Sequence, residues 1–191
     1  FITFRNNDLP GVMLAASFEK YLNRYGVIPD ESPVIFTNNS STFSLLKSLT
    51  DLGHKPKAYV DIRDQKNIEK ETVDLLEKFN IPFYPKSEVE GCEGKKEVKK
   101  VSIRTKKNQI TKIKTSMLCL SGGFNPDIHL FTQSKGLLSW DKDLLTFKPD
   151  RIFQNTITLG SVSGNFSYEK LLVEVEKKLS EFEGLNELEV K

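Results

Sequence analysis

Short apolar runs and amphipathic segments alternate along the first 85 residues of the chain. The apolar runs lie at 34–37, 57–63 and 81–84. The run at 34–37 is continuous, as is typical of a strand buried on both faces of a parallel sheet. Apolar residues at helical spacing predict helices at about 12–25, 41–52 and 67–79. This order predicts an α/β fold, a Rossmann-like and mostly parallel sheet flanked by helices.

The hydrophobic period then changes from helical spacing to alternation. Residues 88–114 alternate apolar and polar side chains, which predicts an inserted antiparallel β-meander. The run at 117–121 returns to a buried strand and delivers Gly122 and Gly123. We also predict a strand at 1–4, and after residue 154 a strand followed by a helix that ends near Gly184. We therefore expect a dinucleotide-binding-like domain at 1–154 and a returning segment at 155–191.

Composition excludes several classes of function. The 191 residues carry 28 basic and 26 acidic side chains, a net charge of +2, so the strongly basic balance of nucleic-acid-binding domains is absent. No apolar stretch approaches the ~20 residues needed to cross a bilayer, and no signal peptide is evident. We expect a cytoplasmic protein with no nucleic-acid or membrane partner. Because it begins at Phe1 without Met, we expect a piece of a longer chain.

Cysteine and histidine positions do not form a metal site. Cys92 and Cys119 have no CxxC spacing, and His54 and His129 lie far from both. Cys119 stands in the apolar run MLCL and is predicted to be a small buried hydrophobe. No Ser, Cys or paired acid stands at a spacing that would make either histidine a catalytic base. We expect no metal site, and we expect both histidines to be structural.

The turn after the first buried strand is the main candidate for chemistry. It reads TNNSST (37–42) and precedes a helix, in a place where dinucleotide-binding folds carry a glycine-rich turn that cradles a pyrophosphate. Asp61 ends the next strand, near the ~20-residue separation at which an acid accepts from a ribose hydroxyl. Without glycine, the turn can instead be a simple helix cap made by Ser40 or Ser41. Both interpretations remain open from spacing alone.

Two further turns have the same ambiguity. LSGG (120–123) brings two glycines to a strand end, where they allow close approach of a ligand or of another segment. LGSVSGN (159–165) delivers a helix whose first N–H groups could face an anion. The candidate cofactor-binding residues are Thr37, Asn38, Asn39, Ser40, Asp61, Arg63, Gly122 and Gly123.

Several longer runs resemble one protein family. NDLPGVMLA (7–15), YLNRYGV (21–27), VIFTNN (34–39) and SGGFNPDIHLFTQS (121–134) occur together and in order. They resemble the α subunit of heterotetrameric sarcosine oxidase. The resemblance covers most of residues 5–145, and the chain looks like the second, inserted dinucleotide-binding domain of that long subunit.

The resemblance implies an oxidoreductase that demethylates sarcosine to glycine, with flavin chemistry on a partner subunit. The complex would hold FAD and FMN, would bind tetrahydrofolate in a C-terminal region absent from this chain, and would include β, γ and δ subunits. NAD is the cofactor expected of this segment if it binds one. The resemblance also implies that no catalytic residue lies in this segment. The favoured function is therefore a dinucleotide-binding module, and the alternative is a scaffold domain that binds no nucleotide and serves subunit assembly.

Overall fold

The computed structural model describes residues 2–142, 144, 146–154 and 156–189, and in the last helix it describes side chains as far as Ser180. The chain forms two compact units, Phe1–Gly123 (unit 1) and Phe124–Lys191 (unit 2). The units divide after Gly123, whereas the sequence analysis divides the chain at 154. The division at residue 154, into two parts of a longer flavoprotein, stays a prediction.

A five-stranded parallel sheet forms the centre of unit 1. Its strands are β1 (Val12–Leu14), β2 (Val34–Thr37), β3 (Ala58–Asp61), β4 (Phe83–Pro85) and β8 (Leu118–Ser121). The strand order is β1-β8-β2-β3-β4, and each neighbouring pair is parallel. Every residue of β2 and β3 is buried, which explains why each strand has three consecutive apolar residues before the polar residue that ends it.

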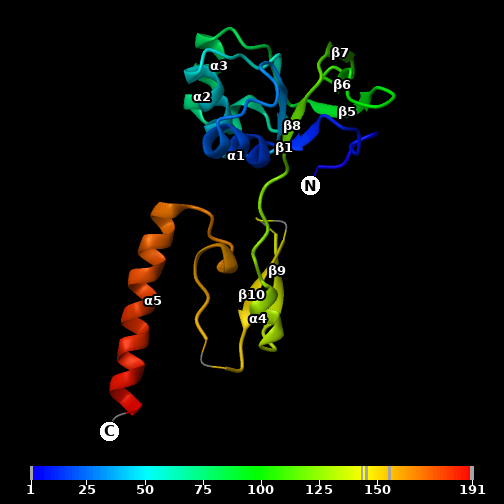
Figure 1. Cartoon of the computed structure of the whole chain (residues 1–191). Helices are drawn as coiled ribbons and strands as arrows, with labels where there is room; N and C mark the ends of the chain where they lie inside the picture. The colour runs from blue at the N-terminus through cyan, green and yellow to red at the C-terminus, as the bar shows by residue number, and fades with distance from the viewer. Residues whose placement is uncertain (1, 143, 145, 155, 190–191) are drawn as a thin grey trace. The chain divides into compact units, whose positions relative to one another are not determined.

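Helices cover one face of this sheet. They are α1 (Ala15–Tyr25), α2 (Phe43–Asp51) and α3 (Lys70–Lys78), with short 3-10 turns η1 (Ser40–Thr42) and η2 (Gln65–Asn67). Figure 1 shows the three helices together on one side of the sheet. Ile35, Tyr59 and Cys119 lie at the same level on three neighbouring strands and belong to the helix-side core. Buried Phe18 and Leu46 are part of the same core.

The antiparallel meander covers the opposite face. It consists of β5 (Glu88–Glu93), β6 (Lys100–Arg104) and β7 (Ile110–Lys114), in the order β5-β6-β7. Its residues Val101 and Ile103 pack with Val34, Phe36 and Val60 of the parallel sheet in a second core. The predicted fold class is confirmed, with one refinement: helices occupy one face and the meander occupies the other.

Two predictions near the N-terminus are wrong. The helix predicted from residue 12 begins at Ala15, because Val12–Leu14 instead forms edge strand β1 beside β8. The segment predicted as a strand at 1–4 is not a strand over residues 2–4; Ile2 and Phe4 pack on the meander-side core, and only Arg5 forms a bridge, to Gly91. Phe1 lies outside the described residues.

Unit 2 contains α4 (His129–Gln133), the hairpin β9 (Leu137–Asp141) and β10 (Thr146–Arg151), the turn η3 (Gly160–Ser163) and α5 (Tyr168–Glu189). The strand predicted after residue 154 is not formed across 156–159, and α5 continues past Gly184. Asn155, Val190 and Lys191, which belong to that predicted segment, lie outside the described residues. Within the described part of the chain, no helix combines the length and apolar character needed to cross a bilayer.

Both cysteines are buried and free, as the apolar context of Cys119 predicts. Cys119 belongs to the helix-side core and Cys92 to the meander-side core. Burial raises the pKa of the Cys92 thiol to about 11 and raises the pKa of Cys119 as well. Each thiol therefore stays protonated near neutral pH and packs as a small apolar group.

Gly11 precedes β1 at a position where no side chain fits. Its φ is +103°, and an added Cβ would lie 2.3 Å from the backbone oxygen of Ser116. We expect Gly11→Ala to lower the free energy of unfolding by about 2 to 3 kcal/mol. Gly53→Ala is the control, because Gly53 has φ +82° with nothing within 4 Å of the added carbon. Urea denaturation followed by far-UV circular dichroism would measure both, and equal losses would contradict the steric argument.

Tyr59 is fully buried, and its hydroxyl oxygen lies 2.7 Å from Thr42 Oγ1. Burial raises its pKa from 10.0 to about 12. In the unfolded chain the Tyr59 hydroxyl loses its proton at a lower pH than in the folded chain. Tyr59 therefore contributes its full stabilisation below about pH 10. The free energy of unfolding then declines by on the order of 2 kcal/mol as the pH rises toward 12. Tyr59→Phe should cost about 1 kcal/mol at pH 8 and remove that alkaline decline. Urea denaturation at pH 8 and pH 11 tests this, with exposed Tyr21→Phe as the control.

Candidate functional site

Three parallel strands end side by side at the candidate site. In the register, Thr37 at the end of β2 is level with Asp61 on β3 and with Ser121 on β8. Open α/β sheets bind ligands outside the carboxyl ends of their strands, next to the point where strand order changes direction. The sheet thus gathers the predicted residues at the edge where a dinucleotide would be expected.

The backbone amides of the turn after β2 donate hydrogen bonds to acceptors within unit 1. Asn38 N donates to Ser121 O at 3.4 Å, and Asn39 N donates to Thr37 Oγ1 at 3.1 Å. Asn39 caps η1, because its Oδ1 accepts from Ser41 N at 2.9 Å. Three amides that a glycine-rich turn would offer to phosphate therefore have acceptors within the protein.

The side chain of Asn39 ties this turn to β8. Its Nδ2 lies 3.2 Å from both Ser121 O and Ser121 Oγ, and Ser41 Oγ lies 2.7 Å from the same Ser121 hydroxyl. Gly123 follows on this edge with φ +95°, and a Cβ there would lie 3.8 Å from Asn39 Nδ2. Glycine at 123 therefore serves backbone conformation rather than close approach, and partly exposed Gly122 links it to Ser121.

Asp61 is held by Arg63. The carboxylate is fully buried, and its Oδ1 accepts from Arg63 N at 2.8 Å and from Arg63 Nε at 3.1 Å. Its Oδ2 accepts from Arg63 Nη2 at 2.9 Å. Three donors satisfy most of the acceptor positions of this buried carboxylate, so little acceptor capacity remains for a ribose hydroxyl.

Glu69 completes the charged cluster. Its Oε1 accepts from Ser40 Oγ and lies 3.7 Å from Arg63 Nη1. Burial acts to raise the pKa of Glu69, but the hydrogen bond from Ser40, a bond from its own backbone and the charge of Arg63 outweigh it and lower the pKa. Burial likewise acts to lower the pKa of Arg63, and bonding to Asp61 reverses this, so its pKa is raised. Two carboxylates around one guanidinium leave the cluster with a charge of −1, which disfavours a phosphate.

The third predicted turn, LGSVSGN in unit 2, is also filled by a carboxylate of the chain. Glu174 on α5 accepts from Gly160 N at 3.2 Å, from Ser163 Oγ at 2.7 Å and from Asn165 Nδ2 at 3.1 Å. Burial acts to raise the pKa of Glu174, but these hydrogen bonds together lower it. The turn does bind an anion, and that anion is its own glutamate.

The structure thus brings Thr37, Asn39, Asp61 and Gly123 to one edge of the sheet, with Ser40 and Arg63 beside them, while exposed Asn38 contributes an acceptor to Asn39 Nδ2 at 2.8 Å. The sequence analysis missed Glu69 and Ser121. Glu69 precedes α3 with no periodic or spacing signal that links it to Ser40, whereas Ser121 could have been found as the last polar residue of β8. Among the described residues, no group of His, Cys, Asp and Glu could hold a metal ion.

Three curated relatives match most of the chain. They are the α subunits of sarcosine oxidase from Corynebacterium sp. strain U-96 (32% identical, 85% of this chain), Corynebacterium sp. strain P-1 (28%, 86%) and Rhizobium meliloti strain 1021 (31%, 76%). The chain spans 17%, 17% and 14% of their lengths, respectively. No model of a known protein family matches the sequence.

Solved structures share the fold at low identity. An L-proline dehydrogenase from P. horikoshii aligns over 85% of this chain and 27% of its own, with a TM-score of 0.57 at 22% identity. A thioredoxin reductase from T. acidophilum aligns over 87% and 55%, with a TM-score of 0.62 at 17% identity. These structures support the fold, and the curated relatives confirm the predicted resemblance: over most of its length, this chain is homologous to a segment of sarcosine oxidase α subunits.

Proposed function

We propose that the chain is part of the α subunit of a sarcosine-oxidase-like amine oxidoreductase, in which unit 1 is a scaffold domain. It keeps a dinucleotide-binding fold without binding a nucleotide at its strand-to-helix turn. One observation carries this choice: the donors and acceptors that a dinucleotide would need at this edge already bond to the protein itself. Asn38, Asn39 and Ser41 amides are used within the turn region, and Asp61 is enclosed by Arg63.

NAD does not fit the site in this arrangement. A pyrophosphate would face a cluster with net charge −1 and would find the three turn amides occupied. A ribose hydroxyl could reach Asp61 only after Arg63 had moved, because the carboxylate has no exposed surface. Rearrangement would leave buried polar groups without partners, which costs about 1 to 3 kcal/mol for each group.

The similarity to sarcosine oxidase α subunits extends this proposal to the chemistry of the whole protein. Oxidative demethylation of an N-methyl amine such as sarcosine would take place at flavin, FAD or FMN, held by other parts of a hetero-oligomer. Tetrahydrofolate would bind a region outside this chain, and β, γ and δ subunits would be the partners. We infer that this chain alone is inactive, because the flavin chemistry would take place on other parts of the complex.

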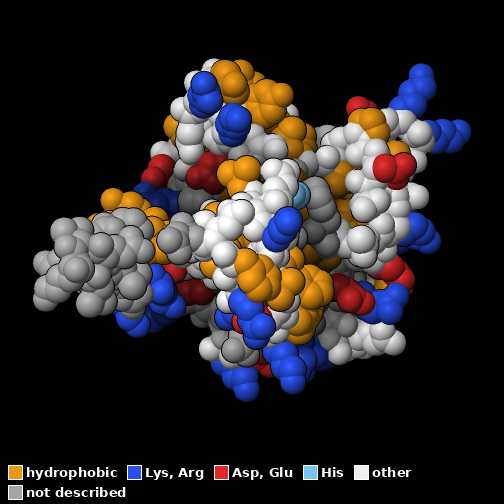
Figure 2. Space-filling view, turned by 90° about the horizontal axis from the view of Figure 1, so that it is seen from below, with side chains coloured by type: hydrophobic (Ala, Val, Ile, Leu, Met, Phe, Trp, Pro, Cys, Tyr) orange, Lys and Arg blue, Asp and Glu red, His pale blue; other side chains and the backbone are white. Residues whose placement is uncertain are grey.

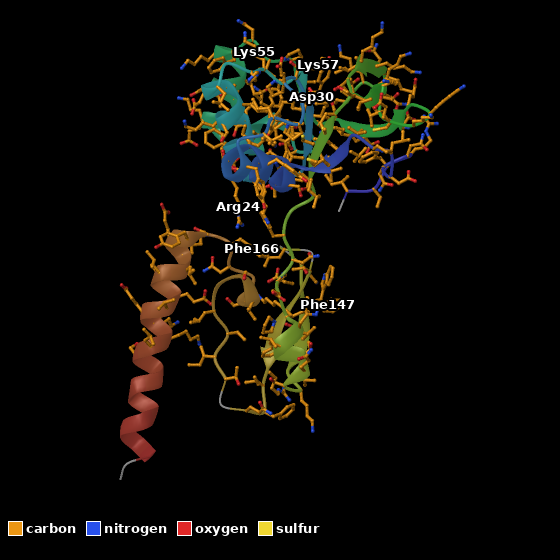
Figure 3. The ribbon with its side chains drawn as sticks, in the orientation of Figure 1. Arg24, Asp30, Lys55, Lys57, Phe147 and Phe166 are labelled. Atoms are coloured by element: carbon orange, nitrogen blue, oxygen red, sulfur yellow. The ribbon has the colours of Figure 1, made fainter. Side chains whose placement is uncertain are left out.

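Exposed apolar side chains in unit 2 support a role in assembly. Phe147 on β10 and Phe166 before α5 are 50% and 41% exposed, and both are labelled in Figure 3. Figure 2 shows exposed apolar side chains with Lys and Arg side chains beside them. The cores of protein–protein interfaces are enriched in aromatic side chains such as these. The other large exposed apolar residues of unit 2 include Phe124, Leu130, Leu137, Trp140, Phe153, Tyr168 and Val173.

The alternative is a dinucleotide-binding module. The observation that favours it is the position of Thr37, Asp61 and Gly123 together at the carboxyl edge of a parallel sheet. It requires Arg63 to leave Asp61, and it predicts measurable affinity.

Calorimetric titration of the chain with NAD, ADP and ATP separates the two functions. We expect no binding at millimolar ligand, because the turn amides and Asp61 are already bonded. Saturable binding of NAD with a dissociation constant below about 0.1 mM, a free energy near −5.5 kcal/mol, would overturn the scaffold proposal. Adenosine serves as the control for stacking without phosphate.

Asp61→Asn distinguishes a structural role of Asp61 from a ligand-binding role. The variant removes the negative charge of fully buried Asp61, which pairs with Arg63, a side chain that is 21% exposed. We expect it to lower the free energy of unfolding by about 2 to 3 kcal/mol, because the charge of Arg63 then lacks its partner. The control, Asp64→Asn, weakens a surface pair with Lys86 and should cost less than about 1 kcal/mol. Urea denaturation measures both. Equal stabilities combined with lost NAD affinity in Asp61→Asn would indicate a ribose-binding role instead.

A further inference from the structure

Strand β7 is the free edge of the antiparallel meander. The strand order is β5-β6-β7, so β7 pairs with β6 on one side and with no described strand on the other. It spans five residues without a proline, whereas β1 and β4, the edge strands of the parallel sheet, have three residues each. A free edge strand presents a row of backbone donors and acceptors with which another strand can pair.

The hydrogen-bond pattern shows which backbone groups of β7 face outward. Thr105 N donates to Gln109 O at 2.9 Å, in the pair that continues the β6–β7 register into the turn. Because bonded and non-bonded pairs alternate along an antiparallel ladder, Ile110, Lys112 and Lys114 occupy the non-bonded positions toward β6. Their N–H and C=O groups therefore point to the free edge.

The side chains along this edge are basic. Residues 105–115 contain four lysines and no acidic residue. Lys112 and Lys114 are exposed, and Ile113 between them packs against the meander-side core. Lys114 stands directly opposite Lys100 of β6, and like charges at opposite positions repel each other. An acidic side chain placed beside these lysines relieves that repulsion.

A second copy of this chain does not suit the edge. Two β7 strands side by side would bring Lys112 and Lys114 close to the same lysines of the other copy. The acidic strand β5 of a second copy cannot serve either, because its outer edge is used by its own chain. Arg5 N donates to Glu90 O at 3.3 Å, and Arg5 O accepts from Cys92 N at 3.0 Å. The lysines therefore disfavour self-pairing and favour an acidic strand of different sequence.

We propose that β7 binds an extended, acidic segment of a partner chain, which adds one antiparallel strand to the three-stranded meander. The inference rests on the proposed function and deepens it, since it assigns the assembly role of the scaffold to one strand edge. Opposite residues of an antiparallel pair have their side chains on the same face. Acidic residues then lie opposite Lys112 and Lys114, and an apolar residue between them packs beside Ile113.

The probe is a fluorescein-labelled peptide of about six residues, the usual length of a strand, in which glutamate and valine alternate. Two modified forms test the geometry: one is N-methylated at the glutamate amides, and the other at the valine amides. Opposite residues of a bonded pair exchange both hydrogen bonds, so glutamates opposite Lys112 and Lys114 direct their amides at β7. The valine amides point away. Binding to the full chain is measured by fluorescence anisotropy at one fixed, low ionic strength.

Two variants of the full chain test the role of charge. Lys114→Glu reverses one charge on the edge, and we choose Lys114 because Lys112 is already paired with Glu93 at 2.6 Å. Lys20→Glu reverses an exposed lysine on α1 and is the control for net charge. Circular dichroism and urea midpoints verify that both variants are folded.

We expect the wild-type chain to bind the unmodified and the valine-methylated peptides, and to bind the glutamate-methylated peptide at least about tenfold more weakly. Lys114→Glu should also lose at least about tenfold in affinity for the unmodified peptide, and Lys20→Glu should lose much less. Equal affinity for the two methylated peptides would overturn the inference, as would equal affinity of the two variants or no binding at millimolar peptide. Failure of the scaffold proposal is a separate result, namely NAD binding by the wild-type chain.

Discussion

The buried carboxylate of Asp61 sets the arrangement of the whole candidate edge. A charge with no exposed surface is costly unless it is paired and hydrogen-bonded. Arg63 provides that pairing from two residues away, and the same loop is fixed from both sides, since Ile62 N donates to Thr37 O and Ser87 N donates to Asp61 O. The remaining donor of Arg63 then faces Ser40 and attracts Glu69. The polar surface at the strand ends thus follows from one charge placed at the end of a buried strand.

The inner strands of the parallel sheet could be predicted, because strands buried on both faces appear in the sequence as three or four consecutive apolar residues. The meander could be predicted because alternation over 88–114 has no helical interpretation. Edge strand β1 could not, because Val12–Leu14 is short and runs directly into α1, so its apolar residues fit helical spacing. The strand expected after residue 154 failed for the opposite reason: alternation is present, but the described residues 156–159 have no strand partner.

The site shows a different limit of sequence reasoning. Spacing placed Thr37, Asn39 and Asp61 at the same edge of the sheet, because strand order and direction decide where strand ends meet. It could not show that Arg63 folds back on its neighbour, nor that Glu69 reaches Ser40 across 29 positions. Side-chain partners depend on packing distances that no residue pattern encodes. The same holds in unit 2, where Glu174 closes the turn at Gly160. In both turns a carboxylate from elsewhere in the chain accepts hydrogen bonds from groups of the turn.

The positions of the two cysteines make the layers of unit 1 separately observable. Cys92 lies between the parallel sheet and the meander, and Cys119 lies between the same sheet and the helices. A thiol that is buried and protonated reacts with alkylating reagents only when its surroundings open. Each of the two cores therefore contains one cysteine whose alkylation rate reports how often that core opens. Comparing the two rates would show whether the meander and the helices separate from the sheet together or one after the other.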